Sequence, residues 1–278
     1  MQAFEEILDV LPVRWRSVDL TGVSELRLRA GQAPGILEGN CERQLPGLVR
    51  AQELEEILQR ASGQSLYACM DTLRQGFVTL PSGHRIGVCG RAVMKNGEMT
   101  GYSAISSLCI RLARDVRIQA DRLLPHLTGP TLIIGPPGAG KTTLLRGCIR
   151  ALSGSGQRIC VADERGEISA FSKGRVQFDL GPQSDVLVGC RKSESMMMLL
   201  RTMDPQWIAA DEITAGPDLR AMEQISYCGV KLLATAHAET VQELHARPLY
   251  RELMQLGIFR RILVLKPDRS FETREEEA

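Results

Sequence analysis

The octapeptide from Gly135 to Thr142 has the residue types and the spacing of a phosphate-binding loop. It reads Gly-Pro-Pro-Gly-Ala-Gly-Lys-Thr and fits the pattern G-x-x-x-x-G-K-[ST]. Glycines let backbone N–H groups turn toward an anion, and a helix that starts directly after them adds partial positive charge. Lys141 is therefore predicted to reach the β- and γ-phosphates of a nucleotide, and the hydroxyl of Thr142 to bind Mg²⁺.

The flanking sequence supports this interpretation. Residues 131–134 form an apolar run typical of a short buried strand, and residues 143–150 have the pattern of a helix. A strand, a glycine-rich loop and a helix are the context in which this motif binds ATP, so a chance match of a glycine-rich turn is disfavoured. Nine residues are expected to contact the nucleotide: Gly135, Pro136, Pro137, Gly138, Ala139, Gly140, Lys141, Thr142 and Thr143.

Two adjacent carboxylates follow another apolar segment, Trp207–Ala210. Asp211 is predicted to hold Mg²⁺ directly or through a water, and Glu212 to polarise the attacking water. Neighbouring residues on a strand point to opposite sides, so the two acids can serve different roles. The alternative is an Asp-Glu pair that merely opens a solvated loop.

A further polar pair and an acidic segment follow two more apolar strands. Thr235 and His237 are expected to contact the γ-phosphate or the lytic water, although a histidine at a strand end can also be structural. The segment from Asp163 to Glu167 reads Asp-Glu-Arg-Gly-Glu. Its Glu164 and Glu167 are candidates for a general base, a Mg²⁺ shell or a structural ion pair, and an exposed salt-bridged loop is the alternative.

Apolar strands and helices alternate along the second half of the chain, which predicts a mostly parallel sheet with helices on both faces. This α/β P-loop domain is assigned to residues 119–278. Its helices are expected at 119–127, 143–152, 193–203, 217–228 and 240–256, and its later strands at 158–163, 207–210, 232–236 and 262–265.

A smaller α+β domain is predicted for residues 1–118. Asn96-Gly97 is a strong signal for a tight turn between two strands. The remaining elements are helices at 2–11 and 52–61 and strands at 25–30, 77–80, 84–94, 98–105 and 108–113.

The composition excludes several classes of protein. Lys and Arg number 34 against 33 for Asp and Glu, so no strong attraction to nucleic acid is indicated. No apolar run approaches the ~20 residues of a membrane span, and the acidic start lacks the basic region of a signal peptide. The eight cysteines form no C-x-x-C pair, which favours buried thiols in a reducing cytosol over a zinc site.

The order of these motifs resembles that of the RecA-like ATPases of type II and type IV secretion and of pilus retraction. Asp163–Glu167 takes the place of their acidic box, Thr235–His237 of their histidine box, and Glu25–Pro34 of the opening strand of their N-terminal domain. The acidic box departs from the usual Glu-Asp-x-x-Glu, because Arg165 and Gly166 stand between its acids.

A closer resemblance, to the stage III sporulation protein AA family of endospore formers, covers nearly the whole chain. It is carried by residues 77–87, 89–93, 163–168 and 185–187. The apolar runs of the chain predict no transmembrane segment of its own. The resemblance implies a cytoplasmic protein of the mother cell that is recruited to a membrane channel complex and forms a homo-hexameric ring. In such a ring, Arg85, Arg91, Arg111 or Arg114 is a candidate arginine finger toward a neighbouring subunit, as in the secretion ATPases, and a solvated strand face is the favoured alternative for each.

Three functions remain open from the sequence. The leading one is a Mg²⁺-dependent ATPase motor, because the motifs supply phosphate binding, metal binding and a water-activating acid. A RecA-like nucleic-acid motor is the second, and the balanced charge disfavours it. The third is a nucleotide-controlled assembly protein without hydrolysis, which would have less need of Glu212.

Overall fold

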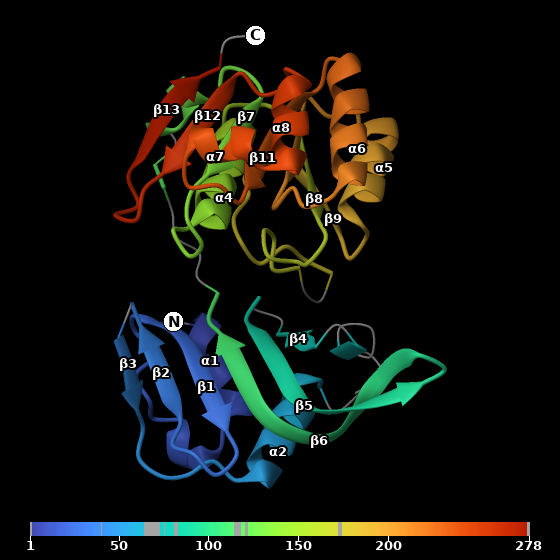
Figure 1. The fold of residues 1–278 in the computed structure, drawn as a ribbon. Helices are drawn as coiled ribbons and strands as arrows, with labels where there is room; N and C mark the ends of the chain where they lie inside the picture. Colours follow the sequence, from blue (N-terminus) through green and yellow to red (C-terminus); the bar gives the residue numbers. More distant parts are fainter. Residues whose placement is uncertain are drawn as a thin grey trace. The chain divides into compact units, whose positions relative to one another are not determined.

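Figure 1 shows the computed structural model of the chain, which describes residues 2–39, 41–63, 73–74, 76–80, 83–113, 118–119, 122–171 and 174–276. The chain divides into two compact units. One comprises Met1–Arg114 with Ala170–Gln177, and the other Asp115–Ser169 with Phe178–Ala278. The domain boundary after residue 118 stays a prediction.

The first unit is built on a six-stranded antiparallel sheet in the order β3-β2-β1-β6-β5-β4. The strands are β1 Val23–Arg29, β2 Gly35–Glu38, β3 Cys41–Gln44, β4 Phe77–Thr79, β5 Arg85–Lys95 and β6 Glu98–Arg111. The helices α1 (Gln2–Val10) and α2 (Ala51–Ala61) share one buried core with alternate residues of this sheet, including Leu26, Ile86 and Ile110. A short 3-10 turn, η1, spans Val13–Trp15.

β5 and β6 continue beyond the sheet as a two-stranded ribbon. β1 pairs with β6 only from Ser107 to Arg111, whereas β5 and β6 stay paired out to Lys95 and Glu98. The ribbon is mostly exposed and extends away from the other strands of its sheet in Figure 1. The predicted Asn96-Gly97 turn is confirmed. The strands predicted at 98–105 and 108–113, however, are one continuous strand.

The second unit contains a seven-stranded sheet in the order β13-β12-β7-β11-β10-β8-β9. The strands are β7 Thr131–Ile134, β8 Ile159–Asp163, β9 Ser184–Val188, β10 Trp207–Ala210, β11 Lys231–Ala236, β12 Arg261–Leu265 and β13 Phe271–Glu275. Neighbouring strands of this sheet run parallel except for β12 with β13. β7, which precedes the phosphate loop, thus lies between β11 and β12.

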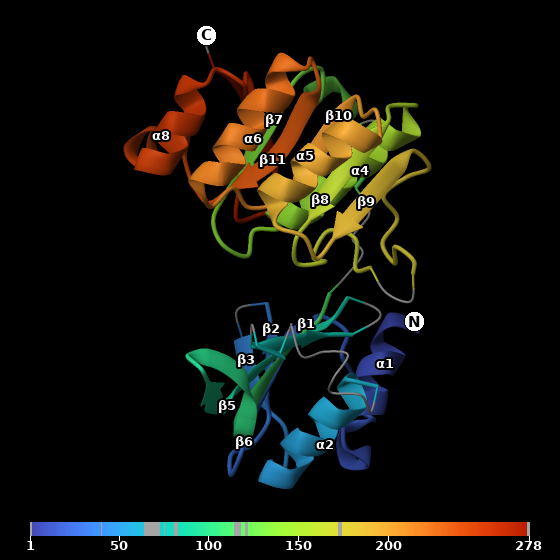
Figure 2. The same ribbon diagram turned by 90° about the vertical axis from the view of Figure 1, so that its right-hand side faces the viewer.

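Helices cover both faces of this sheet, as expected because β7, β8 and β10 are buried along their whole length. The helices are α4 Lys141–Gly154, α5 Lys192–Thr202, α6 Gly216–Tyr227, α7 Val241–Ala246 and α8 Pro248–Gln255. Ile133 of β7 packs in one core with Leu145 of α4, whereas its neighbour Leu132 packs in the other core with Met196 and Met222. Figure 2 shows α5 and α6 side by side on the second face. The predicted fold class is confirmed.

Three predictions differ from the structure. The expected helix 240–256 is two helices, because Pro248 starts α8 and holds Arg247 in an extended conformation. Of the expected helix 119–127, residues 120–121 lie outside the described part and the structure has a 3-10 turn, η4, at Leu124–His126. The cysteines are not uniformly buried. Cys148 and Cys160 are, but Cys41, Cys89 and Cys228 are exposed.

Within the described ranges, no helix combines the length and the apolar character needed to cross a membrane.

Candidate nucleotide site

The phosphate loop connects the end of β7 to the first residue of α4. Gly140 precedes α4 with a φ of 102°, in the left-handed region that glycine adopts without steric cost. Gly135 lies so close to β12 that an added Cβ would stand 2.7 Å from the carbonyl oxygen of Leu265. The glycines at these two positions are therefore required by the path of the backbone.

Lys141 is 7% exposed and folds back onto the loop that it follows. Its Nζ donates hydrogen bonds to the carbonyl oxygens of Gly135, at 2.8 Å, and Pro136, at 3.1 Å. Burial lowers the pKa of Lys141, and the nearby carboxylates of Glu212 and Asp211 oppose this shift. The loop thus holds an ammonium group beside both acids.

Asp211 joins the phosphate loop to two neighbouring strands. The Thr142 hydroxyl donates to Asp211 Oδ2 at 2.7 Å, and the Thr235 hydroxyl donates to Oδ1. Thr142 and Asp211 therefore present a hydroxyl and a carboxylate at one point, and both are hard oxygen ligands suited to Mg²⁺. Mg²⁺ commonly takes its remaining ligands from substrate phosphates and water, so this small donor set fits the ion.

Thr235 and Thr143 were also expected near the nucleotide or the lytic water, and in the structure their hydroxyls contact other side chains of the protein. Thr235 is fully buried, and besides bonding Asp211 its oxygen accepts the N–H of Glu212 at 2.8 Å. It therefore acts on the site through the two acids. The Thr143 hydroxyl lies one position beyond Thr142 on α4 and accepts from the guanidinium of Arg146 at 3.4 Å.

Glu212 turns the chain away from β10. Its φ is +46°, and strand β10 ends two residues earlier at Ala210, so the two acids do not alternate along a strand as expected. Glu212 Oε1 lies 2.8 Å from His237 Nε2, and Oε2 lies 3.7 Å from the Arg165 guanidinium. The structure thus brings Glu212 and His237, predicted from separate motifs, into direct contact.

His237 is held from the backbone as well. Its N–H donates to the Tyr250 hydroxyl of α8 at 3.0 Å, and its carbonyl accepts from Arg247 at 2.7 Å. These contacts fix the backbone of His237, from which the imidazole reaches Glu212. Sequence reasoning did not single out Tyr250 or Arg247, because no spacing signal links them to His237.

The acidic segment that begins with Asp163, the last residue of β8, divides into two parts. Asp163 is buried, and its carboxylate accepts from Ile168 N–H at 3.2 Å, Ser169 N–H at 2.8 Å and the Ser169 hydroxyl at 2.6 Å. Burial raises the pKa of Asp163, and the bonds from Ser169 oppose that rise. Asp163 therefore closes the loop 163–169.

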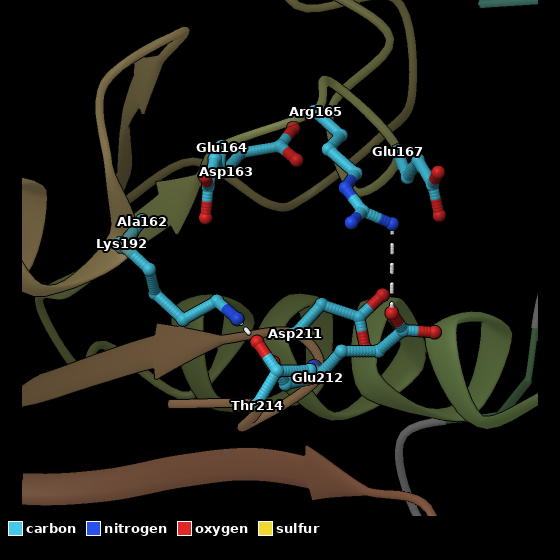
Figure 3. Close-up of a pocket in the computed structure, with 9 residues that line it drawn as sticks. All are labelled: Ala162, Asp163, Glu164, Arg165, Glu167, Lys192, Asp211, Glu212 and Thr214. Carbon is cyan, nitrogen blue, oxygen red and sulfur yellow. Dashed lines mark hydrogen bonds and ion pairs between the residues drawn. The ribbon is translucent and has the colours of Figure 1, made fainter. Parts of the chain in front are cut away.

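The rest of that loop faces the two acids across a small hollow. The hollow has a volume of about 90 Å³ and is lined by Ala162, Asp163, Glu164, Arg165, Glu167, Lys192, Asp211, Glu212 and Thr214. Figure 3 shows Glu164, Arg165 and Glu167 on one side of it, with Arg165 extending toward Glu212 on the other. Both acids proposed from the sequence for this loop thus line the same hollow as Glu212.

Lys192, at the start of α5, is a site residue that the sequence did not indicate. It is 7% exposed, and its Nζ donates to the carbonyl oxygen of Glu212. Asp218 Oδ2 of α6 lies 3.9 Å from the same nitrogen. A lysine that begins a helix gives no sign in the sequence of such a buried contact.

Comparison with solved structures finds chains of the same fold. The pilus retraction motor PilT, crystallised with bound ADP, matches with a TM-score of 0.57 at 15% identity over 87% of this chain and 74% of that one. In sequence, the type II secretion system protein E of Dickeya dadantii is 25% identical over 67% of this chain and 36% of its own length.

Similarity to a sporulation protein is stronger and extends over nearly the whole chain. Stage III sporulation protein AA of Bacillus subtilis is 34% identical over 94% of this chain and 90% of its own length. The family model described as sporulation stage III, protein AA, matches residues 5–273. The chain therefore belongs to the stage III sporulation protein AA family, which is related to the secretion ATPases.

Proposed function

We propose that this protein is a Mg²⁺-dependent ATPase that drives a secretion-type channel complex during endospore formation. One observation carries the proposal: the phosphate loop touches Asp211 through Thr142, and the adjacent Glu212 is paired with His237. Groups suited to phosphate binding, metal binding and water activation thus meet at one place. The ADP bound to PilT, which shares the fold, supports a nucleotide as the ligand.

Each residue has a distinct proposed role. Lys141 would exchange its two loop carbonyls for phosphate oxygens, while Thr142 and Asp211 would hold Mg²⁺. The bound ion would neutralise charge on the phosphates. Glu212 would accept a proton from the attacking water, and His237 would fix its Oε1 so that the carboxylate keeps its aim.

The acids of the loop after β8 are proposed to assist rather than to replace Glu212. Glu164 and Glu167 line the hollow, whereas Glu212 has the direct contact with His237. In this proposal, the two glutamates tune the charge around the site or order its water. Arg165 would restrain the second oxygen of Glu212.

The assembly is proposed from family membership. The protein would act as a homo-hexamer at the cytoplasmic face of a membrane channel complex in the mother cell, in keeping with the sporulation protein to which it is similar. The balanced charge of the chain favours this function over a nucleic-acid motor. A nucleotide switch without hydrolysis is disfavoured by the placement of Glu212.

The decisive experiment measures ATP binding and ATP turnover with and without DNA. We expect Glu212→Gln to bind ATP normally but to lose about 10²–10⁴ in turnover, because the shape is kept and the proton acceptor is lost. Lys141→Ala should lose nucleotide binding with the fold intact. Glu252→Gln, the same change at an exposed position of α8, is the matched control and should behave as wild type.

Each outcome separates the candidate functions. Turnover that requires DNA would favour the nucleic-acid motor, and tight binding without turnover would favour the switch. Unchanged turnover in Glu212→Gln would transfer the base role to Glu164 or Glu167. Wild-type affinity for ATP in Lys141→Ala would contradict the proposed phosphate loop.

A further inference from the structure

Glu212 keeps its position at a cost in backbone energy. A glutamate with a φ of +46° lies in the left-handed region, which is unfavourable for a residue other than glycine. Such a conformation persists when the surrounding contacts determine it on both sides. The contacts that hold Glu212 are therefore part of what aims its carboxylate.

The amide side of Glu212 is held by residues already placed in the site. Its N–H donates to Asp211 Oδ1 at 3.0 Å and to the Thr235 hydroxyl at 2.8 Å. The next N–H, of Ile213, donates to the Thr235 carbonyl at 2.9 Å. These bonds fix where the chain enters and leaves the turn, but they do not reach the carbonyl of Glu212.

Lys192 holds the carbonyl side. Its ammonium donates to the Glu212 carbonyl oxygen, as the dashed line in Figure 3 marks, and lies 3.9 Å from Asp218. Asp218 is 5% exposed and also accepts from Thr214 N–H at 3.3 Å. A buried ammonium is costly unless it is compensated, so the Asp218 carboxylate offsets the burial of Lys192 where its ammonium donates to Glu212.

We propose that Lys192 is a positioning residue that holds Glu212 in its left-handed turn and so keeps the Glu212 carboxylate on His237 and on the attacking water. The inference rests on the proposed hydrolysis for its effect on rate, but its structural part does not. Two other roles of Lys192 would give different experimental results. A lysine that bound phosphate would change ATP affinity, and one that only paired with Asp218 would change stability alone.

The first test compares Lys192→Met, which keeps length without charge, with Lys192→Arg, which keeps a donor. We expect Lys192→Met to lower kcat by about 10²-fold, the size of effect seen when a catalytic group is displaced by ~1 Å, with the Kd for ATP unchanged. Lys192→Arg should recover much of the loss. Lys231→Met is the control. Lys231 begins β11, at the end remote from Thr235, so this variant should keep wild-type kcat.

The second test asks whether Lys192 acts through Glu212. In a Glu212→Gln background, adding Lys192→Met should cause no further loss of kcat, because the group that it positions is already disabled. Two losses that multiply would show an independent role and would overturn the proposal. A rise in the Kd for ATP in the single variant would also overturn it, by assigning Lys192 to phosphate binding.

A third measurement needs no turnover and separates this inference from the proposed function. In a crystal structure of Lys192→Met, Glu212 should leave the left-handed region and lose its contact with His237. If both are retained, the positioning role is wrong whatever the activity. If they are lost while wild type hydrolyses no ATP, the positioning role stands and the proposed function fails.

If Lys192→Met does not fold, a second variant tests the same proposal. Asp218→Asn leaves the lysine in place but removes the charge that holds its ammonium. We expect a smaller fall in kcat, again with unchanged Kd and with Glu212 displaced in the structure. Unchanged kcat in this variant would show that the pair does not control Glu212.

Discussion

Asp163 accepts three hydrogen bonds from residues five and six positions further along the chain, and it is 2% exposed. The sequence groups it with Glu164 and Glu167 because all three are acids within five residues. In the structure all three line the hollow, but the Asp163 carboxylate is bonded to the backbone and to Ser169 of its own loop, whereas the two glutamates are exposed. Residue type alone does not separate these roles, because burial decides them.

Replacing Asp163 should therefore affect stability before chemistry. Asp163→Asn loses one acceptor oxygen and leaves a buried donor of Ser169 or Ile168 without a partner, which costs about 1–3 kcal/mol. Chemical denaturation of the variant beside wild type measures this loss. Glu164→Gln, the matching change on the next residue, should leave stability within about 0.5 kcal/mol because it is exposed.

The same carboxyl gives a pH dependence with a definite sign. Burial raises the pKa of Asp163 in the native state above its ordinary value of 3.8, which applies to the unfolded state. Between the unfolded and the native pKa, the native state therefore binds more protons than the unfolded state. Stability contributed by this group therefore increases as pH falls through the raised pKa. The stability difference between wild type and Asp163→Asn should widen from neutral toward acidic pH, and a narrowing difference would contradict the raised pKa.

At the scale of elements, predictability depended on how each strand is covered. β7, β8, β10, β11 and β12 were predicted because their apolar residues face helices on both sides, and an apolar run records that burial. β2, β3, β9 and β13 were not. Three of these, β3, β9 and β13, are sheet edges, and β3 is exposed along its whole length. Pairing rather than side-chain pattern therefore defines these three strands.

The residues of the candidate site likewise divide into those that the sequence identified and those that it missed. Motifs with local spacing identified Lys141, Thr142, Asp211, Glu212 and His237, and the structure brings Thr142 to Asp211 and Glu212 to His237. Lys192 and Tyr250 were missed because each contributes one long-range contact to a backbone group. A contact to a carbonyl or an amide places no demand on neighbouring residue types, so it leaves no pattern to find.

The β5–β6 ribbon provides a prediction about a single element. Asn96 and Gly97 have φ values of 55° and 81°, so Gly97→Ala should disfavour the turn by about 1–2 kcal/mol. Because the ribbon beyond Gly90 pairs only within itself in the described part of the chain, the damage should stay local. Hydrogen exchange should accelerate at residues 91–104 while the Tm of the protein changes little.

Gly154→Ala is the control for this change, because Gly154 ends α4 with a negative φ and open space around an added Cβ. It should leave exchange in the ribbon as in wild type. Global loss of protection in Gly97→Ala would show instead that the turn contributes to the core of its unit.

At the scale of the whole molecule, the candidate arginine fingers are no longer equivalent. Arg111 lies 3.4 Å from Glu25, and Arg85 stacks 3.7 Å over the Phe77 ring. Arg91 is exposed on the ribbon, and Arg114 lies outside the described residues. Arg91 is therefore the described candidate that would lose least by turning to another subunit.

If Arg91 acts in a neighbouring subunit, activity must depend on assembly. ATP turnover per subunit should rise with protein concentration, and Arg91→Ala should lose that rise while still binding ATP, since a finger supplied in trans contributes about 10³–10⁵ in rate. Arg43→Ala, an exposed arginine of β3, is the control. If Arg85→Ala, Arg91→Ala, Arg111→Ala and Arg114→Ala all keep wild-type turnover at every concentration, no finger of this kind operates.

Because β7 lies between β11 and β12, its place in the sheet also affects how the chain folds during synthesis. β7 ends at Ile134, but its two neighbours start at Lys231 and Arg261, and Gly135 packs on Leu265. At roughly 5–20 residues per second, the ribosome delivers those partners on the order of 5–25 seconds after the phosphate loop. Until then both edges of an apolar strand are open to wrong pairing, so the loop at Gly135 gains its packing partner only after Leu265 has been made.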